Sequence, residues 1–312
     1  MFISFKASFI AFGVSLSLLF VGPLAADTVT PEKDVREGYR KHAALTQLHR
    51  WYQFYENDGV PIENQLDILD KDVRLSSSLG EGVGHEVYRQ RVAKLPVSWQ
   101  NAHKVKSAEP RIDEDGTISI NFEIDYQNVG MIEGVVRTAR LAYTTTLAPT
   151  DKLLPSFTLI KIEQISDGVA DAFKDEYPDN RLRSLMHYWL AIIEDPKRDP
   201  EPARELLADR FSLNFTSGAI TEFDGFRAWL AGPGSQIAAS THVPDNFSYE
   251  KVEDDKYRLK VDFVWQGILP DGKRMTAKTR HSWDVVDNPK DRFAKIETMN
   301  VEILQPFAVA KD

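Results

Sequence analysis

The chain has 312 residues, of which 42% are hydrophobic and 11% aromatic, with a formal net charge of −9 and no cysteine. The acidic balance argues against nucleic acid or an anionic membrane as the main partner, because both favour a basic surface. The absence of cysteine excludes disulfides, thiol nucleophiles and thiolate metal sites.

Residues 1–26 differ from the rest of the chain. Lys6 is their only charge, residues 7–21 are almost wholly apolar, and small residues precede Asp27. This layout predicts a secretory signal peptide cleaved after Ala25 or Ala26. The alternative is an uncleaved anchor, because the apolar run is close to the shortest length that spans a bilayer. We therefore expect a secreted or periplasmic protein without membrane contact after cleavage, and the lack of disulfides favours a bacterial envelope.

About 285 residues follow the signal, enough for one large domain or two of ordinary size. Their first part begins with a stripe at helical spacing, which predicts an amphipathic helix containing Leu45, Leu48, Trp51, Tyr52 and Tyr55. A strand near 69–78, a further helix near His85 and more strands are expected before residue 165. The polar segment 166–180 has little periodicity, and we interpret it as a linker.

The second part begins in the same way. Its helical stripe consists of Leu182, Leu185, Met186, Trp189, Leu190 and Ile193. We expect a short helix around 202–207, a strand at 211–215 and a helix after Asp224. Alternating apolar residues then predict two strands with one buried face each, joined by a hairpin turn at Asp271-Gly272. The residues expected to point inward are Tyr257, Leu259, Val261, Phe263 and Trp265 on the first strand, and Ala277, Thr279, His281, Trp283 and Val285 on the second. A final strand is expected over 293–303.

The two parts are repeats of one another. "EIDYQN" (123–128) matches "DFVWQG" (262–267) at a spacing of 139, and His103 matches His242 at the same spacing. Further matches follow in the same order. Residues 69–78 match 207–216, and 137–147 match 275–285, both at a spacing of 138 residues. "KIEQI" (161–165) matches "KIETM" (295–299) at a spacing of 134 residues. This pattern indicates a tandem duplication. Helices followed by antiparallel strands predict an α+β class, with domains at 34–165 and 181–307.

These residues resemble a known family, the cone-shaped fold of nuclear transport factor two. Its relatives include ketosteroid isomerases, scytalone dehydratase, limonene epoxide hydrolase and SnoaL-like polyketide cyclases. The resemblance is carried by the Trp- and Tyr-rich first helix, "LLADRFSLNF" (206–215), "THVPDN" (241–246), and "DFVWQG" followed by "TAKTRHSW" (276–283). It implies helices on a curved sheet, a ligand cavity between them, and pairing through the sheets, here as an intramolecular pseudo-dimer. Such a fold does not define a function.

The implied cavities point to candidate site residues. In the second copy, Trp265, His281 and Trp283 would face inward, with Tyr188 or Trp189 on the helix and His242 at the mouth. The first copy would present His103, Tyr126, Tyr143, and Trp51 or Tyr52.

His242 and His281 have a chemical interpretation as an acid and base pair, because imidazoles titrate near neutrality. The pair resembles that of scytalone dehydratase, although no carboxylate accompanies "HYWL" (187–190). The carboxylate base of ketosteroid isomerase is also missing, since Ser77 and Phe215 stand in its place. The alternative is that His103 and His242 are structural and that the aromatic residues form core.

Other features suggest no chemistry. His42 and His49 are seven residues apart on one helix, too far to share a metal, and are expected on its exposed face. Gly80, Gly82 and Gly84 lack the dinucleotide spacing, which favours a flexible turn. No cofactor or metal motif is found, so neither is predicted.

Three functions remain open. The first is an exported protein that binds a small apolar or aromatic molecule in a cavity between sheet and helices. The second is a cofactor-independent lyase or isomerase that uses His242 and His281. The third is an assembly domain without a ligand.

Overall fold

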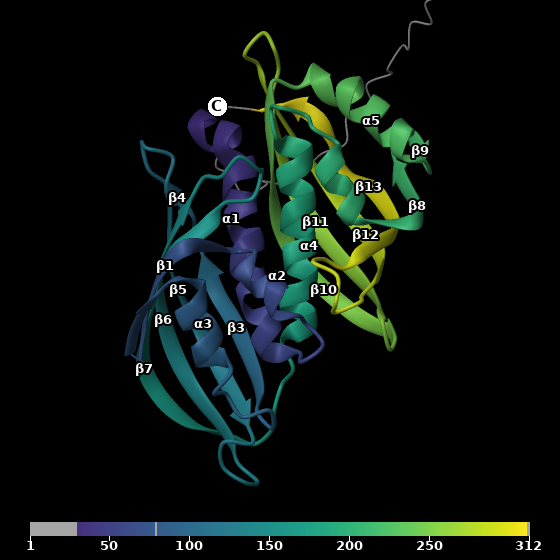
Figure 1. The fold of residues 1–312 in the computed structure, drawn as a ribbon. Helices are drawn as coiled ribbons and strands as arrows, with labels where there is room; N and C mark the ends of the chain where they lie inside the picture. The colour runs from purple at the N-terminus through teal and green to yellow at the C-terminus, as the bar shows by residue number, and fades with distance from the viewer. Residues whose placement is uncertain (1–29, 79, 311–312) are drawn as a thin grey trace, which may run out of the picture.

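The computed structural model describes residues 30–78 and 80–310 and contains two α+β units that follow one another along the chain (Figure 1). The predicted signal peptide, residues 1–26, lies outside the described residues. Each unit consists of helices packed on a curved, mostly antiparallel sheet, which confirms the predicted fold class. We call them the first copy (α1 to β7) and the second copy (α4 to β13).

Over its described residues, the first copy contains three helices and seven strands. Its elements are α1 (Glu32–Glu56), α2 (Ile62–Leu66), β1 (Leu69–Ser77), β2 (Gly80–Val83), α3 (Gly84–Val92), β3 (Gln100–Ala108), β4 (Arg111–Ile112), β5 (Ile118–Val129), β6 (Val136–Ala148) and β7 (Ser156–Ala170). The sheet order is β2-β1-β7-β6-β5-β3, with β4 on β5, and only β1 and β7 run parallel.

The second copy repeats this arrangement. Its elements are α4 (Tyr177–Glu194), η1 (Glu201–Glu205), β8 (Leu207–Phe215), β9 (Gly218–Ile220), α5 (Phe223–Ala231), η2 (Pro233–Gln236), β10 (Ala239–Glu253), β11 (Lys256–Ile268), β12 (Arg274–Val286) and β13 (Lys295–Val309). The sheet order β9-β8-β13-β12-β11-β10 matches that of the first copy. The parallel pair is again formed by the first strand of the copy and its last, here β8 and β13.

Strand register tests the repeat residue by residue. His103 pairs with Tyr126 and His242 with Trp265, so the spacing of 139 is confirmed. The spacing of 134 for the last strands is wrong. Leu75 pairs with Ile160 and its counterpart Leu213 with Met299, which restores 139. The resemblance of "KIEQI" to "KIETM" arose from the shared alternation of strands rather than from equivalent positions.

The two copies contact each other through their first helices. α1 and α4 lie side by side in the centre of the molecule, with a sheet on either flank (Figure 1). This corrects the expectation of pairing through the sheets. α1 is buried on two faces, because the stripe around Leu48 and Tyr52 packs on its own sheet and the opposite face packs on α4.

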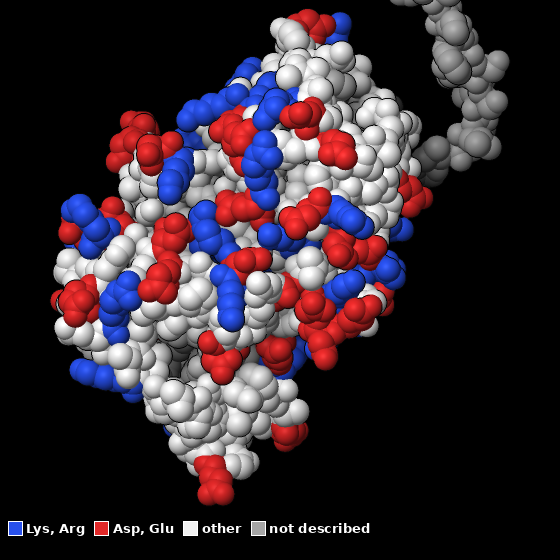
Figure 2. Space-filling view, turned by 45° about the vertical axis from the view of Figure 1, so that its right-hand side comes forward, with Lys and Arg blue, Asp and Glu red and all other residues white. Residues whose placement is uncertain are grey.

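Four further features complete the description of the fold. The Asp271-Gly272 turn forms, with Gly272 at a φ of +83°. The segment expected as linker, 166–180, contains the end of β7 and the first turn of α4, where Pro178 and Asp179 suit a helix start. Among the described helices, none combines the length and the apolar character needed to cross a membrane. Basic and acidic side chains are interspersed over the face in Figure 2.

Candidate functional site: a cavity in the first copy

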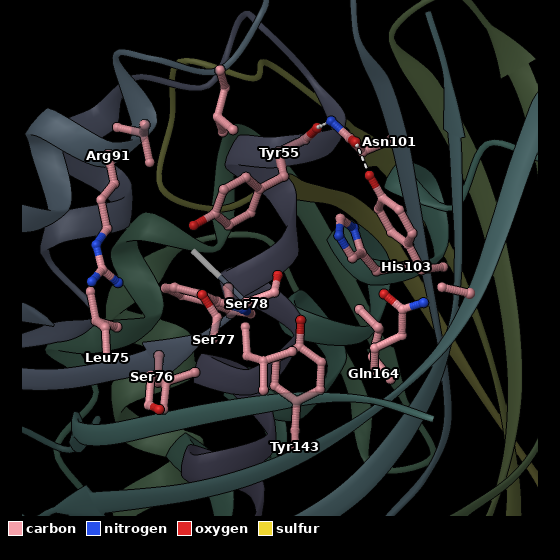
Figure 3. A pocket seen from close by; sticks show the side chains of 18 of the residues that line it. Tyr55, Leu75, Ser76, Ser77, Ser78, Arg91, Asn101, His103, Tyr143 and Gln164 are labelled. Carbon is pink, nitrogen blue, oxygen red and sulfur yellow. Dashed lines mark hydrogen bonds between the residues drawn. The ribbon is translucent and has the colours of Figure 1, made fainter. Parts of the chain in front are cut away.

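The first copy encloses a cavity of about 360 Å³ between α1, α3 and the concave face of the sheet. Aromatic and aliphatic side chains make up most of its wall (Figure 3). Three of the predicted site residues, His103, Tyr126 and Tyr143, line it, together with Trp51 from α1. Tyr52, the other helix candidate, is fully buried behind His103 and stacks on its ring with a centroid separation of 4.7 Å.

A carboxylate fixes the orientation of His103. Glu56, at the end of α1, accepts the backbone N–H of His103 at 2.7 Å, and the same Oε1 atom lies 3.1 Å from Nδ1 of the ring. Burial lowers the pKa of His103 to about 3 and raises the pKa of Glu56 well above its usual value. Because Nδ1 is engaged by Glu56, Nε2 is the ring nitrogen left to meet a ligand.

The proton on Glu56 determines what His103 offers the cavity. When Glu56 is protonated it donates to Nδ1, so Nε2 carries the hydrogen and is a donor. When Glu56 is ionised it accepts from Nδ1–H, and Nε2 becomes an acceptor or a base. The dyad thus has two states that differ at the atom facing the cavity.

Hydrogen bonds between side chains hold the tyrosines of the cavity in place. The Tyr55 and Tyr88 hydroxyls lie 2.7 Å apart, and Tyr126 donates to Oδ1 of Asn101 at 2.7 Å. Asn101 in turn donates to the backbone carbonyl of Tyr55 at 3.0 Å. Burial raises the pKa of Tyr143, which keeps its hydroxyl protonated at neutral pH. The cavity is therefore preorganised.

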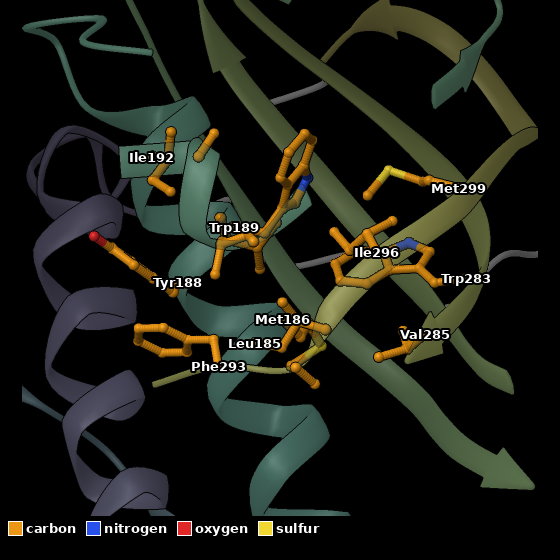
Figure 4. Close-up of a cluster of buried hydrophobic side chains, with 14 of the residues drawn as sticks. Leu185, Met186, Tyr188, Trp189, Ile192, Trp283, Val285, Phe293, Ile296 and Met299 are labelled. Atoms are coloured by element: carbon orange, nitrogen blue, oxygen red, sulfur yellow. The ribbon is translucent and has the colours of Figure 1, made fainter. Parts of the chain in front are cut away.

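The second copy is packed where the first is open. Trp189 and Trp283 are fully buried and pack edge to face with ring centroids 6.3 Å apart, beside Met186, Ile296 and Met299 (Figure 4). Neither tryptophan lines the first-copy cavity or the next two cavities, of about 480 and 440 Å³. The structure thus places these two candidates in the core.

Among the remaining second-copy candidates, the two histidines have separate polar partners. His242 contacts Glu194, His281 contacts the Thr279 hydroxyl at 3.2 Å, and the Phe263 ring packs against both imidazoles. Neither histidine lines the three cavities, so their joint acid–base role stays a prediction. Trp265 packs against Phe307 instead of a cavity.

Tyr188 belongs to the second copy's core but lies at its edge, next to the first copy. It lines the cavity of about 480 Å³ between the copies and packs on Phe293, with ring centroids 4.7 Å apart. The described residues contain no group of three or more His, Asp or Glu side chains placed to hold a metal ion.

A buried polar chain connects the two histidine–glutamate pairs across α1 and α4. On one side, Asn180 donates to Glu56 at 3.1 Å and lies 2.9 Å from Nδ1 of His49. On the other side, Nε2 of His42 lies 3.6 Å from Glu194, which contacts His242 at 2.8 Å. His187 lies between the two sides: its Nδ1 lies 3.0 Å from Nδ1 of His42, and its ring stacks on that of His49.

Sequence reasoning misplaced or missed several of these residues. His42 and His49 are buried, not exposed, because the second face of α1 is covered by α4. Glu56 and Glu194 were missed, although they are 138 residues apart, as are His49 and His187. Extending the repeat to polar helix positions would have found them.

No protein-family model matches the chain, and no curated protein matches it significantly. Among solved structures it is similar to a hexachlorocyclohexane dehydrochlorinase of Novosphingobium barchaimii, with 15% identity over 42% of this chain and 89% of that one, and a TM-score of 0.37. It is also similar to a nuclear transport factor 2-like superfamily protein of Salmonella enterica, with 15% identity, 41% and 92% coverage, and a TM-score of 0.35. An uncharacterised cystatin-like-fold protein of Caulobacter vibrioides shows 14% identity, 41% and 90% coverage, and a TM-score of 0.34.

Each half of the chain has the same order of helices and sheet strands. The similarity to these solved structures concerns the fold alone. It does not identify a substrate, so the function has to be argued from the cavity.

Proposed function

We propose that this protein binds a small aromatic or apolar molecule in the cavity of its first copy. The observation that carries the proposal is the difference between the copies: the first keeps an open, preorganised aromatic cavity, whereas Trp283 and its neighbours fill the second. Ligand sites are typically concave and apolar, with a few placed polar groups. His103, Asn101 and the tyrosine hydroxyls are such groups.

The second copy supplies the design of a blocking variant. Phe215 and Trp229 stack there, with ring centroids 4.6 Å apart and planes 11° apart. At the spacing of 138 their counterparts are Ser77 and Arg91, which line the first cavity. We call Phe215 and Trp229 the aromatic plug. The double variant S77F/R91W transfers the plug to the first copy.

Binding can be measured with N-phenyl-1-naphthylamine, a neutral fluorophore that brightens in apolar sites. We expect saturable binding by the wild type and at least a tenfold loss in S77F/R91W, because the plug occupies the cavity. R111W, which changes an exposed arginine of the same copy, should bind like the wild type. Equal binding by the plugged variant and the wild type would contradict the proposal.

The Glu56–His103 dyad favours a second candidate function, a cofactor-independent isomerase or lyase acting in the same cavity. Its basis is His103, which lines the cavity and whose Nδ1 atom contacts a carboxylate, so that Nε2 is left to act on a ligand. The probe is 2-tetralone, an aromatic ketone with exchangeable α-protons, followed in deuterated buffer by NMR. Faster exchange than in buffer is expected for the wild type but not for H103Q. If 2-tetralone binds and exchanges only at the buffer rate, the dyad is not a base and binding is the better account.

A further inference from the structure

One charged side chain lines the first-copy cavity. Among the described residues, Arg91 on α3 is the only Asp, Glu, Lys or Arg in its wall. Within residues 30–78 and 80–310 it forms no ion pair and no side-chain hydrogen bond. Its positive charge acts on the Tyr55 hydroxyl, opposing the burial that raises the pKa of that group. Arg91 lies on the opposite side of the cavity from His103 (Figure 3).

The backbone beside Arg91 leaves room for its guanidinium. A Cβ atom added at Gly82 would lie only 2.8 Å from Nη2 of Arg91 and 2.6 Å from Cγ1 of Val87. The strand register makes Ile220 the counterpart of Gly82, since Gly82 pairs with Leu75 and Ile220 with Leu213. Gly82 lies within β2, and a side chain at this position would displace both Val87 and the Arg91 guanidinium.

Three positions differ together between the copies. The second copy has Ile220 and the aromatic plug where the first has Gly82, Ser77 and Arg91. The plug closes its copy with apolar surface. The first copy instead places a cation, and hydroxyls of the β1 serines, at the wall of an otherwise apolar cavity.

We propose that the ligand of this cavity is an aromatic or apolar acid whose anionic group pairs with Arg91. This inference rests on the proposed function. The half-buried guanidinium of Arg91 has no side-chain partner among the described residues, and its planar fork matches a carboxylate through two parallel hydrogen bonds. Of the residues that the structure describes, no Asp or Glu lines the cavity to repel an anion, although the chain as a whole carries a charge of −9. The apolar walls contact the body of the ligand and Arg91 selects its acid group.

The test compares 2-naphthoate with its neutral isostere 2-naphthamide by titration calorimetry at about pH 8, where the acid is ionised. We expect the wild type to bind naphthoate about 10- to 100-fold more tightly, the ratio typical of a charge-assisted hydrogen bond. R91Q should reduce that ratio to about one while its affinity for naphthamide is unchanged. R111Q removes an exposed arginine of the same copy and should keep the wild-type ratio.

The outcomes separate this inference from the proposed function. Equal wild-type affinity for the acid and the amide would overturn the acid ligand and leave cavity binding intact. No binding of either compound or of N-phenyl-1-naphthylamine would overturn the proposed function itself. If R91Q does not fold, R91K replaces it: the ratio should drop several-fold, because one ammonium cannot reproduce the fork, and an unchanged ratio would overturn the assignment to Arg91.

Discussion

His49 and His187 lie face to face where the two copies meet, with ring centroids 5.8 Å apart and planes 9° apart. They are equivalent residues, one from α1 and one from α4, so the repeat brings each imidazole onto its own counterpart. Burial lowers the pKa of His49 to about 4 and that of His187 well below its usual value. Both rings are therefore uncharged at neutral pH, and protonation would place two like charges together.

We predict that the protein loses stability as the pH falls below about 6.5. Between 6.5 and 4 an unfolded histidine binds a proton that folded His49 does not, so the free energy of unfolding decreases with falling pH. Urea unfolding from about pH 8 to pH 5 should show this slope, and H187Q should reduce it. H85Q, which changes a half-buried histidine outside the interface, is the control. Parallel profiles for the wild type and H187Q would contradict this account.

Glu194 should oppose that trend. Burial raises its pKa to about 7, while His42 acts in the other direction. Between 4.5 and 7 the folded carboxyl keeps a proton that the unfolded one loses, so this group alone lowers stability as the pH rises through that window. A glutamine side chain at this position mimics the protonated form. E194Q should therefore gain about 2 to 3 kcal/mol relative to the wild type between pH 5 and pH 8. The exposed-site variant E133Q should show a constant difference, and the same result for E194Q would refute the assignment.

Arg181 should be important for stability, because it anchors the loop before β13 to α4 and also contacts α1. It is buried, pairs with Asp287 at 2.7 Å, donates to Gln53 of α1 at 2.9 Å, and donates to three backbone carbonyls of the loop before β13. R181M should cost about 3 to 5 kcal/mol, because it leaves buried Asp287 without its cation. R183Q, from a partly exposed pair, should cost about 1 kcal/mol or less. Chemical denaturation measures both, and D287N in the R181M background should recover part of the loss.

A small aromatic molecule should restore the stability that is lost when the Trp283 side chain is truncated. Its counterpart in the first copy is Thr145, and W283T should destabilise the protein by about 3 to 5 kcal/mol by leaving a cavity. Indole has the shape of the deleted ring, so it should raise the melting temperature of W283T but not that of the wild type. Absence of this rescue would show that the second copy collapses around the missing ring.

The sequence was sufficient for the duplication and the α+β architecture, because strand alternation and helical stripes are local patterns that repeat at nearly constant spacing. It could not show how the copies pack. The polar face of α1 carries His42, His49 and Gln53, which is typical of an exposed face, and it is buried because it packs on α4.

The candidate site was predicted in part. His103, Tyr126 and Tyr143 follow from strand parity, and all three line the cavity. Which copy keeps a cavity depends on side-chain volume at equivalent positions such as Thr145 and Trp283. The alternation of inward and outward residues along a strand gives no information on that volume. Arg91 was missed because it lies on a short helix whose inward face is not defined by periodicity alone.

Asn180 and His42 occupy equivalent positions in the buried polar chain but are different residues. This difference has a consequence for how such a protein can change over evolutionary time. In an assembly of two identical subunits every substitution is made twice, so a residue that suits one subunit must suit the other. Joining two subunits in one gene removes that constraint. One half can become a rigid scaffold while the other keeps space for chemistry, and the symmetric ancestor could not have separated these tasks.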